Sequence, residues 1–216
     1  MLMSTRNEVA VPDPALLQRF DIPGPRYTSY PTADRFVDAF DPDAFAGWLA
    51  RRGETAAKVP LSLYVHLPFC NTVCYYCACN KVITKDHGRT GEYLEALARE
   101  VELVDGLLTG PRQIEQLHFG GGTPTFLSND ELRQLMKLLT SHFPLAPRGE
   151  YSIEVDPRST PPDKVAALGE LGFNRMSVGV QDFEPDVQIA VNRLQSYEIT
   201  KATIDAARLA NFKSVN

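Results

Sequence analysis

The feature of this sequence that most constrains its fold is a regular alternation of strand-like and helix-like segments after Pro60. The strand patterns cover residues 61–67, 114–119, 151–155 and 175–180, and a fifth begins near Lys213. Between them, apolar residues recur at helical spacing, for example from Tyr93 to Leu108 and from Leu132 to Leu139. Repeated strand–helix units predict a parallel sheet with right-handed crossovers.

The predicted strands alternate apolar and polar residues, which is unusual for a parallel sheet. Strands that are covered on both faces read as continuous apolar runs. In the first strand, Leu63, Val65 and Leu67 share one face, while Tyr64 and His66 share the other. If helices cover the apolar faces, the polar faces must surround ligand or water, because buried polar groups without partners are costly. The pattern favours an incomplete α/β barrel with a lumen, and a doubly wound sheet is the alternative.

All four cysteines lie in the ten residues C-N-T-V-C-Y-Y-C-A-C, from Cys70 to Cys79. A disulfide framework would distribute its cysteines, so this cluster indicates metal or metal–sulfur chemistry in a reducing compartment. Cys70, Cys74 and Cys77 have the spacing C-x-x-x-C-x-x-C, unlike the paired motifs of a zinc ribbon. Three thiolates on one loop can hold three irons of a cubane and leave the fourth open. A structural zinc site on all four cysteines and a chance run of thiols are the alternatives.

Polar or glycine-rich elements follow four predicted strands, and the carboxyl ends of parallel strands meet at one edge. These elements are the cysteine loop, G-G-G-T-P at 120–124, Glu154 with Asp156, and Gln181 with Asp182. The glycine run does not fit G-x-G-x-x-G, which disfavours a dinucleotide site. Glu154 faces the predicted lumen, where a cationic ligand would offset its desolvation. We therefore expect one site at this edge.

The cysteine loop resembles that of the radical S-adenosylmethionine (SAM) enzymes. The extension to Cys79 narrows the resemblance to the oxygen-independent coproporphyrinogen III oxidase family. The strings P-G-P-R-Y-T-S-Y-P-T-A at 23–33, E-V-D-P at 154–157 and V-Q-D-F at 180–183 add to this likeness, which runs from Pro23 to Asn216. It implies an incomplete (β/α) barrel of radical SAM type, comprising about the first four to five β/α units.

The resemblance also implies the cofactors and their binding residues. A [4Fe–4S] cluster would be held by Cys70, Cys74 and Cys77, and two SAM molecules would bind beside it. Positions that match SAM contacts in the family are Gly121, Gly122 and Thr123 for the amino group, Glu154, Tyr64 and Tyr76 for the first SAM, and Gln181 and Arg193 for a second. Cys79 would be a thiol needed for turnover without ligating the cluster. His66 and His118 face the predicted lumen but receive no role.

Without the resemblance, several of these residues have ordinary explanations. Tyr64 and Tyr76 can pack around the loop, Glu154 can be a solvated carboxylate at a strand end, and Arg193 can lie on the surface. A glycine-rich turn can be no more than a turn. We keep these readings open at this point.

The activity implied is oxidative decarboxylation of two propionates of coproporphyrinogen III, which gives protoporphyrinogen IX in haem biosynthesis through a 5′-deoxyadenosyl radical. An electron donor is required, and its identity cannot be read from the sequence; the full-length protein is expected to be a monomer. A haem-binding carrier of the same fold is the alternative, but such carriers typically lack the second cysteine of C-x-C and R-Y-T-S-Y-P, and both are present here. A zinc-stabilised interaction module is an alternative of another class.

Composition and the positions of proline and glycine divide the chain into three regions. Residues 1–40 are rich in proline and predict an extended arm. Residues 41–59 predict a short helix, capped by Asp41 and ended by Gly53, with a linker. Residues 60–216 predict the N-terminal part of the barrel. Because family members are much longer and the chain stops inside an apparent strand, we expect a fragment that is inactive alone and prone to aggregate.

The net charge of −5, with no basic stripe, disfavours nucleic acid as a partner. No N-terminal segment has the pattern of a signal peptide. The apolar run 61–69 is too short to cross a bilayer and contains His66 and Pro68. The sequence therefore predicts a soluble, cytoplasmic protein.

Overall fold

The computed structural model describes residues 13–22, 32–55 and 59–216. The chain divides into two units, residues 1–45 and 46–216. In the first unit, helix α1 (Pro14–Phe20) begins at Asp13, whose side chain accepts a hydrogen bond from the Ala15 amide, and a 3-10 turn covers Ala33–Arg35. The predicted arm is thus partly helical. Its string R-Y-T-S-Y-P, residues 26–31, lies outside the described residues.

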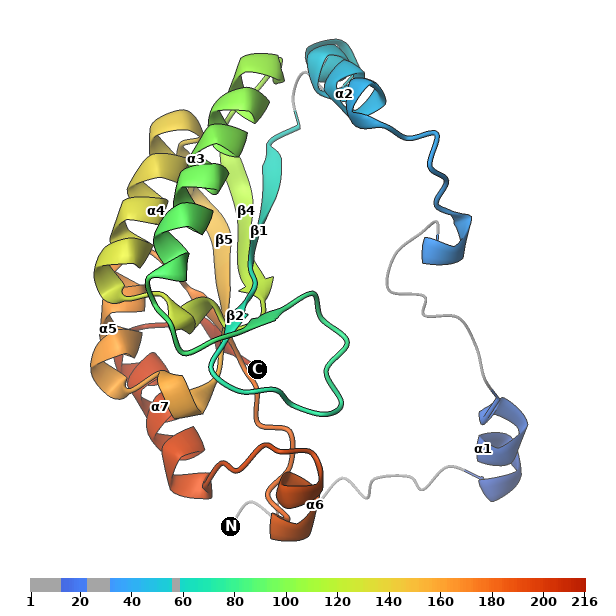
Figure 1. The fold of residues 1–216 in the computed structure, drawn as a ribbon, viewed down its shortest axis with the longest axis vertical. Helices are drawn as coiled ribbons and strands as arrows, with labels where there is room; N and C mark the ends of the chain where they lie inside the picture. The colour runs from blue at the N-terminus through green and yellow to red at the C-terminus, as the bar shows by residue number, and fades with distance from the viewer. Residues whose placement is uncertain (1–12, 23–31, 56–58) are drawn as a thin grey trace, which may run out of the picture. The chain divides into compact units, whose positions relative to one another are not determined.

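The second unit is built on a parallel sheet of five strands in the order β1–β4–β5–β6–β7 (Figure 1). The strands are β1 (Leu61–Leu67), β4 (Ile114–Gly121), β5 (Leu145–Val155), β6 (Arg175–Val178) and β7 (Ser214–Val215). Two short strands, β2 (Phe69–Cys70) and β3 (Val82–Ile83), pair separately around the cysteine loop.

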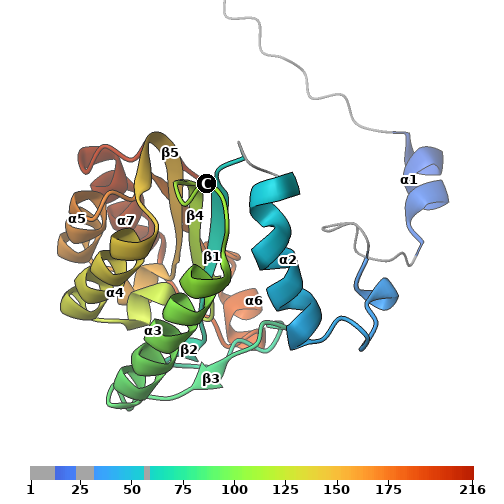
Figure 2. The same cartoon turned by 90° about the horizontal axis from the view of Figure 1, so that it is seen from above.

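Four helices cover one face of this sheet, as Figures 1 and 2 show from two directions. They are α3 (Arg89–Leu107), α4 (Asn129–His142), α5 (Pro162–Glu170) and α7 (Tyr197–Leu209). A short helix, α6 (Pro185–Ala190), lies between β6 and α7 in the chain. Strands that add in chain order under helices on one face form an incomplete α/β barrel, whereas a doubly wound sheet reverses its strand order. The predicted fold class is confirmed, and no closed barrel is present in residues 59–216.

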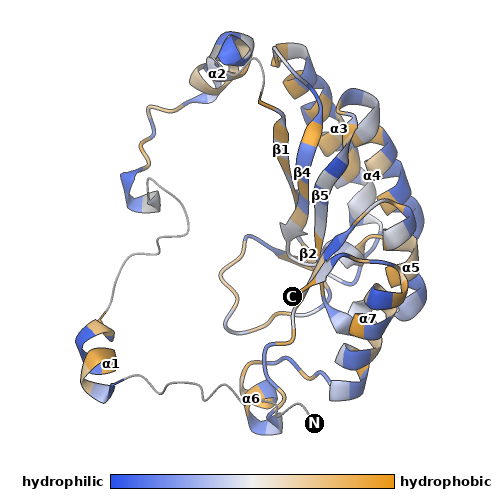
Figure 3. Ribbon diagram, turned by 180° about the vertical axis from the view of Figure 1, so that it is seen from behind, coloured by the Kyte–Doolittle hydropathy of each residue, from blue (hydrophilic) through white to orange (hydrophobic). Residues whose placement is uncertain are grey.

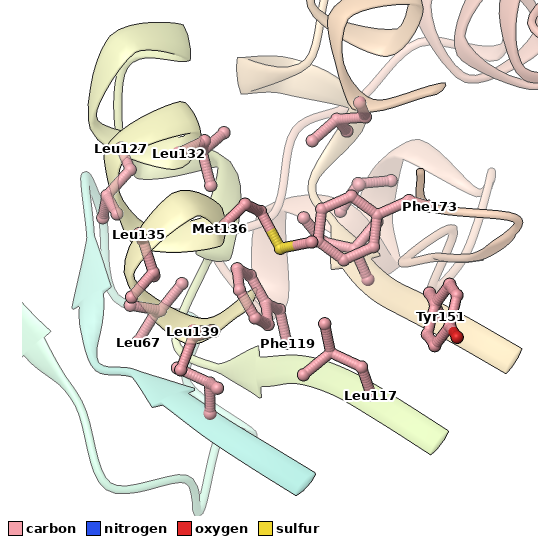
Figure 4. Close-up of a cluster of buried hydrophobic side chains, with 14 of the residues drawn as sticks. Leu67, Leu117, Phe119, Leu127, Leu132, Leu135, Met136, Leu139, Tyr151 and Phe173 are labelled. Atoms are coloured by element: carbon pink, nitrogen blue, oxygen red, sulfur yellow. The ribbon is translucent and has the colours of Figure 1, made fainter. Parts of the chain in front are cut away.

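The alternation seen in the sequence separates a buried face from a polar face. The apolar side chains Leu67, Leu117, Phe119, Ile153 and Met176 are fully buried. Figure 4 shows several of them against α4, which contributes Leu132, Leu135, Met136 and Leu139. On the opposite face, Ser62 and Tyr64 are exposed, and His118 and Glu154 are half-buried. Hydrophilic and hydrophobic segments alternate along β4 in Figure 3.

The strand boundaries differ from the predicted ones at three places. β4 continues through Gly121, β5 begins at Leu145, and β6 ends at Val178 instead of Val180. The Gly179 amide makes the last ladder bond, to the Val155 carbonyl, and β6 ends there because the Val180 amide turns back to the Val178 carbonyl.

One predicted helix end is wrong. Helix α2 (Pro42–Thr55) is capped by Asp41 as expected, but it continues through Gly53. A Cβ at Gly53 would lie 2.9 Å from Thr109 Oγ1 and 3.1 Å from the Gly110 amide nitrogen. This glycine therefore marks a close approach of two backbones and does not end the helix.

Within the described ranges, no helix is both long and apolar enough to span a membrane.

Helix α4 begins with the complete capping box that the pattern S-x-x-E at 128–131 predicts. The Ser128 hydroxyl accepts from the Glu131 amide at 3.2 Å, and the Glu131 carboxylate accepts from the Ser128 amide at 2.7 Å. We expect Ser128→Ala to lower the free energy of unfolding by about 1 kcal/mol in urea denaturation. Ser141→Ala, near the exposed end of the same helix, should change it by less than about 0.5 kcal/mol. Equal effects of the two substitutions would contradict this account of the cap.

Candidate functional site

A cavity of about 510 Å³ opens at the carboxyl edge of the sheet. The cysteine loop and the segments that follow β4, β5 and β6 line it, together with Arg193 from the turn before α7. Predicted site residues in its lining are Cys70, Cys74, Tyr76, Cys77, Cys79, Gly121, Gly122, Thr123, Glu154, Gln181 and Arg193. Tyr64 is the predicted residue that does not line it. The structure thus brings together residues from four chain segments that sequence reasoning placed at one edge.

The cysteine loop carries thiols in different environments. Cys74 is buried, Cys70 and Cys77 are half-buried, Cys79 is exposed, and all four are free thiols. The Cys70 sulfur lies 3.4 Å from Thr123 Oγ1, so the loop contacts the segment after β4. Lys81 donates to the carbonyl of Cys77 at 2.9 Å and to that of Cys79 at 3.3 Å.

Desolvation governs the electrostatics of the loop. Burial raises the pKa of the Cys70 thiol, against a hydrogen bond with Thr123 that lowers it. Burial, followed by a hydrogen bond with Cys77, raises the pKa of the Cys79 thiol. Burial also raises the pKa of Tyr76 to about 12, so its phenol stays neutral and can donate a hydrogen bond.

The donor set fits an iron–sulfur cluster. Thiolates are the ligands that such clusters use, and all four cysteines of the loop line the cavity, among them the three with the spacing C-x-x-x-C-x-x-C. In the described ranges, no three Cys, His, Asp or Glu side chains are arranged to hold a single metal ion. A cubane attaches each thiolate to a different iron, so its ligands need not converge on one point. Binding would release the thiol protons, since only thiolates ligate metal.

The glycine run allows β4 to pass very close to the end of β1. Gly121 has a φ of +118°, which a residue with a side chain rarely adopts. A Cβ at Gly122 would lie 2.5 Å from the Pro68 carbonyl oxygen. The Gly122 and Thr123 amides donate to the carbonyls of Leu67 and Phe69 at 2.9 and 2.8 Å. Gly121 and Gly122 are therefore needed for the close contact between the two chain segments. They also expose backbone groups to the cavity.

Glu154 belongs to a polar network on the lumen face. Its Oε1 lies 3.3 Å from His118 Nε2, and His118 Nδ1 contacts the Ser152 hydroxyl. The Tyr64 ring stacks on His118 at 5.8 Å between centroids, and its hydroxyl lies 2.9 Å from His66 Nδ1. Burial, and then the charge of Glu154, raises the pKa of Tyr64. Sequence reasoning left His118 without a role, although the register that pairs it with Ser152 follows from the aligned strands.

The pairing of the Asp156 carboxylate with two arginines is the part of the site that sequence reasoning missed. Asp156 and Arg193 are each 8% exposed, and Arg193 Nη1 lies 2.9 Å from Asp156 Oδ2. Arg158 pairs with the same carboxylate, with Nη2 at 2.7 Å from Oδ2 and Nε at 3.1 Å from Oδ1. Arg193 is therefore interior, contrary to the ordinary reading of a lone arginine. Asp156 follows the predicted strand and was expected at this edge, but no local pattern indicates its pairing with Arg193, 37 positions further along the chain.

Gln181 completes the rim of the cavity. It has a φ of +65°, in the left-handed region, and its side chain packs over Gly179. A Cβ at Gly179 would lie 3.1 Å from Gln181 Nε2 and 3.0 Å from Arg193 Nη2. This glycine therefore makes room for both side chains.

The comparisons with known proteins agree with this arrangement. The model of the radical SAM superfamily matches residues 64–216, and the chain belongs to that superfamily. A [4Fe–4S] cluster and SAM are therefore its cofactors, and the donor set described above fits them. The resemblance to radical SAM enzymes is confirmed.

Among curated proteins, the chain is 52% identical over 206 residues to the oxygen-independent coproporphyrinogen III oxidase of Pseudomonas aeruginosa and 47% identical over 204 residues to that of Escherichia coli. Each match covers 94% of this chain and 44% of the relative. Among solved structures, the Escherichia coli coproporphyrinogen III oxidase, a radical SAM enzyme, aligns with a TM-score of 0.84 at 44% identity, over 94% of this chain and 44% of that one. The chain thus spans less than half the length of these relatives.

The close approach at Gly122 gives a direct test of the site's scaffold. Gly122→Ala forces its Cβ against the Pro68 backbone, and we expect a loss of about 1–3 kcal/mol in the free energy of unfolding. Gly106→Ala, in helix α3, has nothing within 4 Å of the new Cβ and should stabilise by about 0.5–1 kcal/mol. Thermal unfolding of both variants makes the comparison. If Gly122→Ala unfolds at the wild-type temperature, the contact is not as close as described.

Proposed function

We propose that this chain carries the cluster and SAM site of an oxygen-independent coproporphyrinogen III oxidase. The observation that supports this most is that one cavity is lined by the three spaced thiols, the glycine run, Glu154 and Arg193. The chain is also 52% identical to an oxygen-independent coproporphyrinogen III oxidase. The C-x-C extension that ends at Cys79, typical of this family, lies in the same loop. The reaction would convert two propionates of coproporphyrinogen III to vinyl groups.

In this proposal the residues of the chain bind, orient and exclude water. Cys70, Cys74 and Cys77 would hold the cluster, which would supply the electron for cleavage of SAM into methionine and a 5′-deoxyadenosyl radical. Backbone groups at Gly121, Gly122 and Thr123, with the Glu154 carboxylate, hold the SAM amino group. Arg193 suits a SAM carboxylate, because its Nε is buried without a hydrogen-bond partner in the described part of the chain.

The remaining predicted residues complete the site. Gln181 and Tyr76 line the cavity wall against SAM, and Tyr64 supports Glu154 through His118. Together with Arg193, Gln181 belongs to the proposed site for a second SAM molecule. Cys79, exposed beside the cluster loop, is the proposed thiol for turnover.

The proposal extends to the setting of the reaction. The substrate is a tetrapyrrole, an external donor supplies electrons, and the full-length protein acts as a monomer. Four free thiols are typical of a reducing compartment, which supports a cytoplasmic location.

The proposal also includes a division of the chain into three regions. Residues 1–40 form an arm, 41–59 a helix and linker, and 60–216 the barrel portion.

The first experiment tests cofactor and reaction together. After anaerobic reconstitution, we expect about four iron and four sulfide per chain. The polypeptide completed to the length of its relatives should then release 5′-deoxyadenosine and a vinyl product from SAM, reductant and coproporphyrinogen III. Bound zinc without sulfide would sink the cluster proposal. A cluster with bound haem and no vinyl product would favour the haem-carrier alternative.

The role of Glu154 has a matched control on its own strand. Glu154→Gln removes the charge offered to the SAM amino group, and we expect SAM affinity to fall about tenfold or more with unchanged iron content. Glu150→Gln alters a carboxylate of the same strand face that pairs with Arg175 at 3.0 Å, outside the cavity lining. Its SAM affinity should match the wild type. Calorimetry of the reconstituted proteins measures both, and equal affinities would remove Glu154 from the site.

A further inference from the structure

The turn that follows helix α6 contacts the cysteine loop at three successive residues. The Tyr75 amide donates to the Val191 carbonyl at 3.0 Å. The Asn192 side chain donates to the Val73 carbonyl at 2.7 Å, and Arg193 Nη1 lies 3.6 Å from the Cys74 sulfur. Val73 and Asn192 are 119 positions apart, as are Cys74 and Arg193.

These contacts tie the middle of the cysteine loop to a distant segment of the chain. Cys70 is fixed by the pairing of β2 with β3, and the Cys77 carbonyl is bound by Lys81. Cys74 lies between these two anchors and is the buried thiol of the loop. Within the loop its carbonyl accepts from the Cys77 amide at 3.0 Å, and Arg158 hydrogen-bonds with its sulfur. The turn formed by residues 191–193 adds backbone and side-chain contacts from a third chain segment.

The turn is itself rigidly built. Asn192 adopts φ +55°, in the left-handed region, and the Arg193 amide donates to the Gln188 carbonyl at 2.8 Å. The buried Gln188 side chain donates to the carbonyls of Asp182 and Gln195 and accepts from the Gln195 amide. Every polar atom of that amide side chain is used in holding the turn.

Arg193 is also fixed at its far end. Its Nη1 pairs with Asp156, and its Nη2 donates to the Gly179 carbonyl at 3.1 Å. Asp156 binds Arg158 as well, so two guanidinium charges and one carboxylate charge lie beside Cys74. The group therefore keeps a net positive charge next to the sulfur.

We propose that the turn 191–193 positions Cys74 by fixing the middle of the cysteine loop. Through Arg193, the turn also stabilises negative charge on the Cys74 sulfur. Hydrogen bonds and positive charge at a cluster sulfur favour the reduced cluster, and groups that orient ligands increase metal retention. This inference rests on the proposed cluster, and it adds a determinant of cluster retention and reduction potential.

The positioning of Cys74 by this turn is tested with Asn192→Gly in the protein extended to the length of its relatives. Glycine tolerates the left-handed conformation, so the variant loses the bond to Val73 without backbone strain. Asn211→Gly is the matched control, since Asn211 is an exposed asparagine with φ +60° outside the cavity lining. We expect Asn192→Gly to lose iron to a chelator roughly two- to tenfold faster, while Asn211→Gly matches the wild type.

A second readout does not need the cluster. In metal-free protein, alkylation of Cys74, followed by mass spectrometry, should be slow beside that of exposed Cys79. Asn192→Gly should accelerate it roughly two- to tenfold. If Asn192→Gly alkylates and loses iron at wild-type rates, the turn does not position Cys74. If reconstituted wild-type protein contains no iron and sulfide, the proposed function is wrong. The alkylation comparison alone would then decide whether the turn positions Cys74.

The charge effect is measured separately, as the midpoint potential of the cluster without SAM. Arg193→Gln removes the charge beside Cys74 and should shift the potential to a more negative value. Arg175→Gln removes an arginine of the sheet that pairs with Glu150 and does not line the cavity, and it should leave the potential unchanged. An unchanged potential in Arg193→Gln would overturn the electrostatic part of the proposal.

Discussion

The structure depends on one constraint, which is that a parallel sheet covered by helices on one face has a polar second face. Burying polar side chains without partners is costly, and the protein satisfies them with each other. His118 joins Ser152 to Glu154, and Tyr64 stacks on His118. The polar groups end at a cavity where three thiols and a glycine run meet. Fold and site therefore follow from the same alternation.

The Asp156 carboxylate provides the partner that the charged groups of the site need, as the polar side chains provide partners for each other. Arg193 is buried and Arg158 is half-buried. Their charges would repel each other without a partner, and a buried charge without a partner is strongly destabilising. Asp156 binds both, and through them it connects the end of β5, the turn before α7 and the cysteine loop. The site is thus held by long-range contacts between segments distant in sequence, which explains why a nine-tenths-buried arginine can lie beside a thiol.

Much of the fold was predictable because it depends on local patterns. Alternation in the strands and the capping box at Ser128 each act within a few residues. Gly53 was misread because a glycine inside a helix and one that ends a helix look alike in sequence, and a contact with Thr109 distinguishes them. The cavity lining was predictable from strand ends. The pairing of Arg193 with Asp156, and the seat of Cys74, were not, because they join residues far apart in the chain.

The central claim is that Cys70, Cys74 and Cys77 share one cubane and leave one iron without a protein ligand. Mössbauer spectroscopy of protein reconstituted with ⁵⁷Fe measures this most directly. The account predicts one iron site that differs from the other three and whose signal changes when SAM is added. Four iron sites that do not respond to SAM, or the spectrum of a mononuclear centre, would contradict it.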